Sequence, residues 1–100
     1  MLDQKQARKI AQEYLDDRIC TQDEKFDIVD EATIERDFGW VFFYETREYV
    51  ESGDEMARAV GNAPLLVDRR SGELHVTGTG RDVEHYIKMY EQFGACYPDK

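Results

Sequence analysis

Residues 26–50 read FDIVDEATIERDFGWVFFYETREYV, and this stretch decides the fold. Apolar and polar side chains alternate over residues 26–37, which predicts a β-strand with one buried face. The sequence Asp37-Phe38-Gly39 predicts a tight turn, because glycine readily takes a positive φ. Residues 40–50 return as a second strand, so the pair forms an antiparallel hairpin. The first five residues of that strand, 40–44, are all apolar, which is typical of a central strand.

A helix precedes the hairpin, from about residue 3 to residue 18. Asp3 can cap its N-terminus, and Gln6 can complete a capping box. The apolar residues of this segment recur at helical spacing and form one stripe that faces a core: Ala7, Ile10, Ala11, Tyr14 and Leu15.

Turn residues divide the chain after the hairpin into short elements. A helical turn is expected at 55–60, and the sequence Gly61-Asn62-Ala63-Pro64 predicts a turn after it. Strands at 65–68 and 73–79 follow, joined by a turn at Ser71-Gly72.

A second amphipathic helix follows at about 81–93. Thr79, with Asp82 three residues later, is a typical helix start. The apolar stripe of this helix comprises Val83, Tyr86, Ile87, Tyr90 and Phe93.

These elements predict a single α+β domain over residues 1–100, in the order helix, four-stranded antiparallel meander, helix. Both helices are expected to pack on one face of the sheet. The opposite face would be partly open, and would be either an interface or an ordinary solvated surface. On the strand alternation that face carries Glu31, Thr33, Glu35, Val41, Phe43, Glu45, Arg47, His75 and Thr77.

The charge of the chain is concentrated in one third of its length. Residues 23–55 hold twelve acidic and three basic side chains, which gives −9, and this equals the net charge of the whole chain. Nucleic acids and anionic membranes would be repelled by such a region, whereas a basic protein would be attracted to it.

Motifs that carry chemistry are lacking. His75 and His85 have no nucleophile or metal-ligand spacing around them, so no catalytic, metal or cofactor site is predicted. The pair Arg69-Arg70 and the sequence Gly78-Thr79-Gly80-Arg81 are interpreted as turn residues. Cys20 and Cys96 lack ligand spacing and are expected to be reduced thiols, with a disulfide between them as the alternative. No apolar run is long enough for a signal peptide or a membrane span, so a cytoplasmic location is expected.

An ordered set of sequences resembles a known family. The set comprises Glu31-Ala-Thr-Ile-Glu35, Gly39-Trp-Val-Phe-Phe-Tyr44, Gly61-Asn-Ala-Pro-Leu-Leu-Val-Asp-Arg69, Gly72, and His75-Val-Thr-Gly-Thr79. Over residues 5–92 it is similar to the immunity protein 35 family, the YrhB-like domain of bacterial polymorphic toxin systems.

The resemblance implies a function in binding, not in catalysis. Such proteins are encoded beside toxins and are thought to bind and block the cognate toxin in the producing cell. The family supplies no contact residues to carry over. The resemblance therefore implies a protein toxin as partner but does not name it.

The charge and the resemblance together predict an immunity protein whose acidic region steers a cognate toxin with a basic surface. A tight interface would also need aromatic or arginine anchors, and Phe43, Arg47 and Tyr49 are candidates. The alternatives are a chaperone-like or housekeeping protein-binding domain, and a small enzyme built around a histidine. The predicted contact residues are Glu31, Glu35, Asp37, Phe43, Glu45, Arg47, Glu48, Glu51, Asp54 and Glu55.

Overall fold

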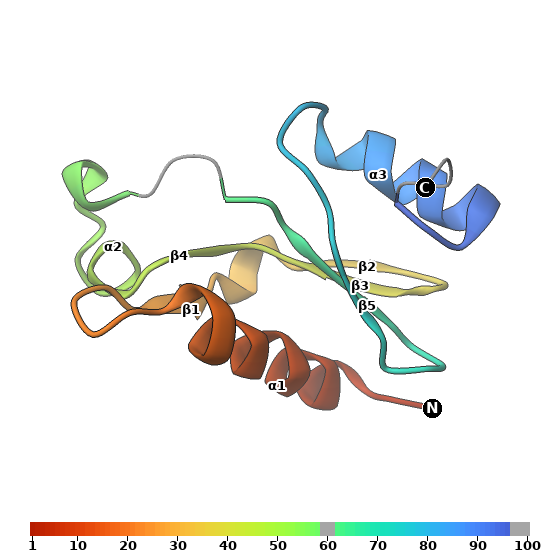
Figure 1. The fold of residues 1–100 in the computed structure, drawn as a ribbon, viewed down its shortest axis with the longest axis horizontal. Helices are drawn as coiled ribbons and strands as arrows, with labels where there is room; N and C mark the ends of the chain where they lie inside the picture. The colour runs from red at the N-terminus through yellow and green to blue at the C-terminus, as the bar shows by residue number, and fades with distance from the viewer. Residues whose placement is uncertain (59–61, 97–100) are drawn as a thin grey trace.

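The computed structural model describes residues 1–58 and 62–96 (Figure 1). The helices are α1 (Gln4–Tyr14), η1 (Leu15–Ile19), η2 (Asp30–Ala32), α2 (Arg47–Ser52), η3 (Glu55–Ala57) and α3 (Val83–Phe93). The strands are β1 (Phe26–Ile28), β2 (Ile34–Arg36), β3 (Gly39–Phe42), β4 (Tyr44–Thr46), β5 (Leu65–Asp68) and β6 (Leu74–Val76). The helical turn predicted at 55–60 begins as η3, and its last two residues lie outside the described residues, as does Gly61 of the turn predicted after it. The α+β class and the two long helices are as predicted.

The predicted hairpin is present, but each of its strands is divided in two. The outer part pairs β1 with β4, from Phe26 opposite Thr46 to Ile28 opposite Tyr44. The inner part pairs β2 with β3, closed by the predicted turn. The short helix η2 interrupts the first strand between these parts, so the hairpin belongs to two sheets.

The second hairpin strand ends earlier than predicted. It stops at Thr46, whose hydroxyl accepts a hydrogen bond from the backbone N–H of Tyr49 and so caps helix α2. The same hydroxyl donates to the carbonyl of Ala57, at 2.6 Å. Arg47, Glu48 and Glu51 therefore lie on a helix and not on a sheet face.

The four-stranded sheet has the order β2-β3-β5-β6, and every pair is antiparallel, so the meander is confirmed. Strand β3 lies in its interior and is buried along its whole length. Gly39 begins this strand at a φ of 148°, opposite Asp68. A Cβ atom at Gly39 would lie only 2.0 Å from the carbonyl oxygen of Val67, so this approach of β3 to β5 requires glycine.

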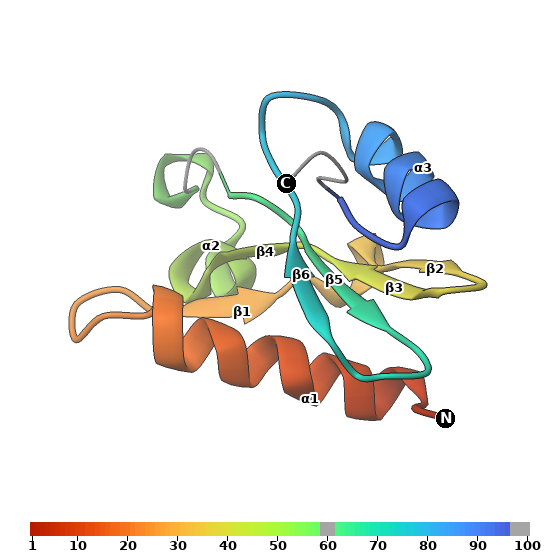
Figure 2. The ribbon, with the colours of Figure 1, turned by 45° about the vertical axis from the view of Figure 1, so that its right-hand side comes forward.

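The two long helices cover opposite faces of the sheet, so the prediction that they share one face is wrong (Figure 2). We call the two resulting clusters the α1-side core and the α3-side core. The α1-side core contains Ala7, Ala11, Leu15, Phe26, Ile28, Trp40, Phe42, Tyr44, Leu65 and Val67. The α3-side core contains Val41, Leu66, Tyr86, Ile87, Tyr90 and Cys96. The physical reason is the alternation along β3 and β5, which points apolar side chains to both faces, and each face needs a cover.

Helix α3 begins at Val83, slightly later than the predicted start at about residue 81, and Thr79 does not cap it. Asp82 is its N-cap, and its carboxylate accepts a hydrogen bond from the backbone N–H of His85. Tyr90 fixes this helix to the sheet, since its hydroxyl donates to Asp68 Oδ2 at 2.6 Å. Burial and this hydrogen bond raise the pKa of Tyr90, so its hydroxyl remains a donor throughout the neutral range.

The contact between Tyr90 and Asp68 makes stability depend on pH. Burial alone would raise the pKa of Asp68, but hydrogen bonds from Tyr90 and from the backbone at Ser71 and Arg70 lower it below its usual value. A lowered pKa means that the carboxylate stabilises the fold above its unfolded pKa, and that this contribution is lost as pH falls through the folded pKa.

We therefore expect Tyr90→Phe to lower the free energy of unfolding by about 1.5–3 kcal/mol at pH 7. Urea unfolding at neutral pH and in acid measures the effect, and the difference from wild type should shrink in acid. Tyr14→Phe is the matched control, because among the described residues the Tyr14 hydroxyl makes no side-chain hydrogen bond. An equal loss in both variants would contradict the assigned role of Asp68.

The two cysteines pack on different faces of the sheet and are free thiols. Cys20 packs against the α1-side core and Cys96 lies in the α3-side core. The sheet between them is incompatible with the short Cβ separation that a disulfide needs.

Candidate partner-binding surface

The ten predicted contact residues are spread along the molecule and do not gather at one place. Asp37 lies in the β2–β3 turn, with Glu35 in the adjoining strand. Four of the others, Arg47, Glu48, Glu51 and Glu55, lie on helices α2 and η3 at the other end of the long axis, which measures 37 Å (Figure 1). The acidic third of the sequence therefore does not form one continuous patch.

Several of the acidic side chains are engaged in ion pairs within the chain. Arg47 holds Asp27 with two hydrogen bonds, of 2.9 and 3.0 Å. These bonds raise the pKa of Arg47. The Glu35 carboxylate forms an ion pair with the Arg69 guanidinium, with 2.8 Å between oxygen and nitrogen. The same guanidinium lies over the ring of Trp40.

Four of the predicted acidic contacts remain exposed and neither join an ion pair nor cap a helix. These four are Glu31, Asp37, Glu48 and Glu51. Within residues 1–58 and 62–96, no basic side chain forms an ion pair with any of them. Glu31 lies on η2, and Glu48 and Glu51 lie on α2. Three of the four acidic residues without an ion pair are therefore on these two helices.

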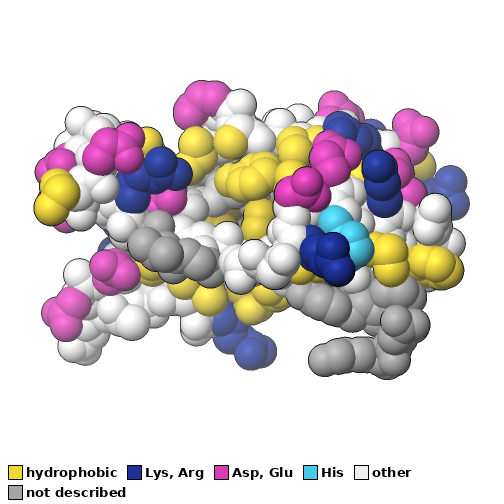
Figure 3. Space-filling view, turned by 90° about the horizontal axis from the view of Figure 1, so that it is seen from above, with side chains coloured by type: hydrophobic (Ala, Val, Ile, Leu, Met, Phe, Trp, Pro, Cys, Tyr) yellow, Lys and Arg dark blue, Asp and Glu magenta, His cyan; other side chains and the backbone are white. Residues whose placement is uncertain are grey.

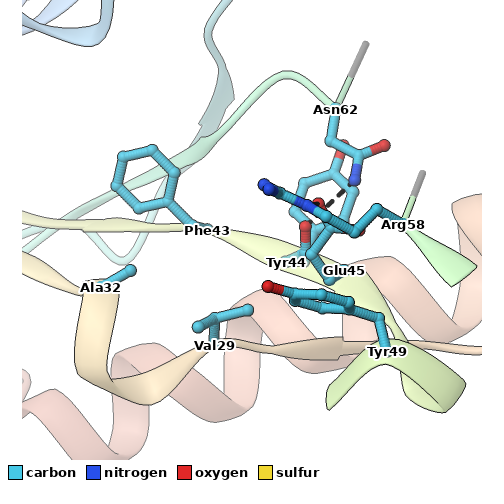
Figure 4. A pocket seen from close by; sticks show the side chains of 8 residues that line it. All are labelled: Val29, Ala32, Phe43, Tyr44, Glu45, Tyr49, Arg58 and Asn62. Atoms are coloured by element: carbon cyan, nitrogen blue, oxygen red, sulfur yellow. Dashed lines mark hydrogen bonds and ion pairs between the residues drawn. The ribbon is translucent and has the colours of Figure 1, made fainter. Parts of the chain in front are cut away.

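A cleft of about 390 Å³ opens between η2 and α2, above strand β4 (Figure 4). It lies on the same side of the molecule as α3, where hydrophobic side chains are gathered in a hollow between charged ones (Figure 3). Its lining is largely apolar and aromatic: Val29, Ala32, Phe43, Tyr44, Glu45, Tyr49, Arg58 and Asn62.

The charged groups of this cleft come from its floor and its rim. Glu45 lies on β4 and is only 8% exposed. Arg58 enters from the rim and passes above the ring of Tyr49, with 5.1 Å from its guanidinium carbon to the ring centroid (Figure 4). Its nitrogens lie 3.5 Å from Glu45 and 3.5 Å from Glu55. Asn62 closes another part of the rim by donating to the Tyr44 carbonyl.

Two groups of the cleft, a tyrosine and the arginine, have a defined charge state. Burial raises the pKa of Tyr44, and the nearby Tyr14 adds to this effect, so Tyr44 stays neutral. Coulombic interactions with Tyr49, Glu55 and Glu45 raise the pKa of Arg58, which therefore stays cationic.

A second hollow, of about 480 Å³, lies on the other side of Arg58. It is more polar and carries the exposed Met56, which is 92% exposed, at its edge. Its acidic lining residues, Asp23, Glu24 and Glu48, are matched by the basic Lys25, Arg47 and Arg58. Arg58 thus lines both an aromatic cleft and a polar hollow of mixed charge.

The structure changes the role of several predicted contacts. Glu45 is buried, and Arg47 is exposed but engaged in an ion pair with Asp27. Val41 was expected on an open face, but α3 covers it completely. Phe43 and Tyr49 do line one cleft, as anchor candidates should.

Sequence reasoning missed Arg58 and Asn62. Both lie outside the acidic segment, and both reach the cleft only because the chain after α2 folds back over β4. The one signal was that Arg58 is a basic residue three positions after the end of the acidic segment 23–55.

The described part of the chain contains no group of three or more His, Cys, Asp or Glu side chains arranged to hold a metal ion. Within the same residues, no helix has the length and apolar character needed to cross a bilayer.

Comparison with known proteins places the chain in a family. No solved structure matches it. A relative from Escherichia coli (strain K12), described as uncharacterized protein YrhB, is 51% identical over 53 residues. That match covers 53% of this chain and 56% of the relative, so it spans about half the length of each. The family described as immunity protein 35 matches residues 5–88, which include all of α1 but its first residue, all six strands and the cleft. The chain therefore belongs to the immunity protein 35 family.

Proposed function

We propose that this chain neutralises a cognate bacterial toxin by binding it stoichiometrically in the cytoplasm of the producing cell. Membership of the immunity protein 35 family carries this proposal. The net charge of −9 supports it, because an acidic inhibitor attracts a toxin whose surface is basic and repels nucleic acids and anionic membranes. No catalytic role is assigned to any residue.

The cleft between η2 and α2 is the proposed centre of the interface. It offers partly buried aromatic side chains, and the exposed Glu31, Glu48 and Glu51 lie on the two helices that flank it. Such an arrangement combines an anchor site with charges that steer the encounter. Phe43, Glu45, Tyr49 and Glu55 are the proposed contacts at or beside the cleft.

The chaperone-like alternative is weakened by the position of α3. That alternative uses an open sheet face to hold unfolded clients, and α3 covers the face with Tyr86, Ile87 and Tyr90. It would regain weight if the chain protected unrelated unfolding proteins from aggregation.

Co-expression tests the proposed function directly. The probe is the C-terminal toxin domain encoded beside the gene for this chain. We expect cells that express this domain to grow only when the chain is present, and the two proteins to purify as an equimolar complex. Cell death in the presence of folded chain, with no complex formed, would reject the proposal.

Charge reversal tests the steering. The triple variant Glu31→Lys, Glu48→Lys, Glu51→Lys should lower the association rate with that toxin domain by about tenfold or more at low salt, because long-range attraction raises such rates by about 10–10³. Glu35 is a poor choice because Arg69 pairs with it at 2.8 Å, and Glu45 because it is buried, so a lysine in either place would disturb the fold.

The control variant makes the same change in net charge on other elements: Glu13→Lys, Asp17→Lys and Glu91→Lys. Glu13, Asp17 and Glu91 are exposed, on α1, η1 and α3. Stopped-flow association at several salt concentrations compares the two triples. If both lower the rate equally, the net charge steers the partner, and the surface around the cleft has no special role.

A further inference from the structure

The aromatic cleft already contains a cation supplied by the chain itself. The guanidinium of Arg58 lies over the ring of Tyr49, and its Nε is 3.5 Å from the buried carboxylate of Glu45 (Figure 4). A guanidinium over an aromatic face is attracted by the ring quadrupole, and a carboxylate adds a charge interaction. The cleft therefore has the chemistry of a site for a cationic side chain.

Arg58 is held less tightly than the other paired arginines of the chain. The closest contacts of Arg8, Arg36, Arg47 and Arg69 with their carboxylates are 2.6, 2.9, 2.9 and 2.8 Å. Both ion pairs of Arg58 are 3.5 Å long, and its side chain is 51% exposed. Pairs at this distance and exposure contribute little to stability, so Arg58 can leave the cleft at low cost.

Glu45, in contrast to the half-exposed Arg58, is buried. It is 8% exposed at the floor of the cleft, on a strand that pairs with β1 at Asp27. A buried carboxylate costs free energy unless cations and hydrogen-bond donors compensate it. A cation that fills the cleft completely, and excludes water from it, would interact with Glu45 more strongly than the half-exposed Arg58 does.

We propose that this cleft receives an arginine or lysine side chain of the toxin, which displaces Arg58. The inference rests on the proposed function, and it names the chemistry of the anchor that the interface uses. Charge complementarity supports this occupant, because residues 23–55 carry the whole net charge of −9 and favour a basic partner. Arginine is also among the residues that most often carry the binding energy of interfaces.

Displacement predicts opposite effects for two substitutions. Glu45→Gln keeps the shape of the floor but removes its charge, so it should weaken binding of the neighbouring toxin domain at least tenfold, mainly through faster dissociation. Arg58→Ala removes the competing cation, so it should strengthen binding severalfold. Arg70→Ala is the matched control, because Arg70 is exposed on the β5–β6 turn and its loss changes the net charge equally.

Biolayer interferometry with the toxin domain measures these changes, and the fluorescence of Trp40 verifies that each variant is folded. Weaker binding by Arg58→Ala would show that Arg58 itself contacts the toxin, and would overturn the displacement. Unchanged binding by Glu45→Gln would overturn the cleft as an anchor site.

A second probe works without any toxin. Nα-acetyl-argininamide is titrated into the ¹⁵N-labelled chain, and the amide signals of Glu45, Tyr49 and Asn62 are followed by NMR. We expect these signals to shift at a lower ligand concentration in Arg58→Ala than in the wild type, and not to shift in Arg58→Ala combined with Glu45→Gln. Absence of any shift in Arg58→Ala would overturn the cation site. If the wild-type chain failed to bind the toxin domain, the proposed function would fall, and this titration would still decide the chemistry of the cleft.

Discussion

Replacing Gly39 with alanine is expected to lower the free energy of unfolding by about 3 kcal/mol or more. The new Cβ atom would lie 2.0 Å from the carbonyl oxygen of Val67 and 2.9 Å from the backbone nitrogen of Arg69. Both neighbours are backbone atoms of the adjacent strand and its end, and neither can move without opening the β3–β5 pairing. The hydrogen bond of 2.7 Å from the Arg69 N–H to the Phe38 carbonyl would be strained as well.

Gly53→Ala is the control that separates the close approach from the backbone conformation. Gly53 has a φ of 73°, and a Cβ atom added there would meet no described atom within 4 Å. Alanine at this position encounters only the strain of a positive φ, about 1 kcal/mol. Urea unfolding followed by circular dichroism compares the two variants. Equal losses would mean that the strand approach at Gly39 can relax.

Phe42→Ala is expected to lower the free energy of unfolding by about 3–5 kcal/mol. Phe42 is completely buried in the α1-side core, opposite Leu65 of the neighbouring strand. Its removal leaves a cavity between α1 and the sheet, because the closely packed helix cannot collapse far enough to fill it. A domain of this size has about 5–15 kcal/mol of stability, so the variant should be close to unfolding.

Phe93→Ala provides the matched control. Phe93 is 58% exposed at the end of α3, so its truncation should change stability by no more than about 0.5 kcal/mol. Trp40 is the only tryptophan and is 1% exposed, and its fluorescence therefore reports unfolding of the core in both variants. A small loss for Phe42→Ala would mean that α1 moves in to fill the space.

The core and the proposed interface use different parts of the same hairpin. Strand β3 is covered on both faces and carries the stability of the sheet. Strand β4 continues it past Phe43, beyond the cover of α3, and there the aromatic cleft opens. Residues of one continuous apolar run, 40–44, thus belong to the buried core at one end and to the proposed binding surface at the other.

The sequence by itself determined the class of fold, because the relevant signals are local. The capping box of Asp3 and Gln6, the turn at Gly39 and the alternation over the hairpin depend only on near neighbours, and each is present in the structure. Local signals also located the meander and both long helices. The residues quoted for the resemblance identified the family, which the match over residues 5–88 confirms.

The tertiary structure alone decided where those elements lie in space. Alternation shows which residues of β3 share a face, but it cannot show which helix covers each face, and so the helices were wrongly placed together. The sequence likewise cannot show which acidic side chains are engaged in ion pairs, because pairs such as Glu35 with Arg69 join residues far apart in the chain. The cleft was missed for this reason too. Arg58, Glu45 and Tyr49 meet only after the chain folds back over β4, and a contact made by chain reversal has no periodicity for a sequence to display.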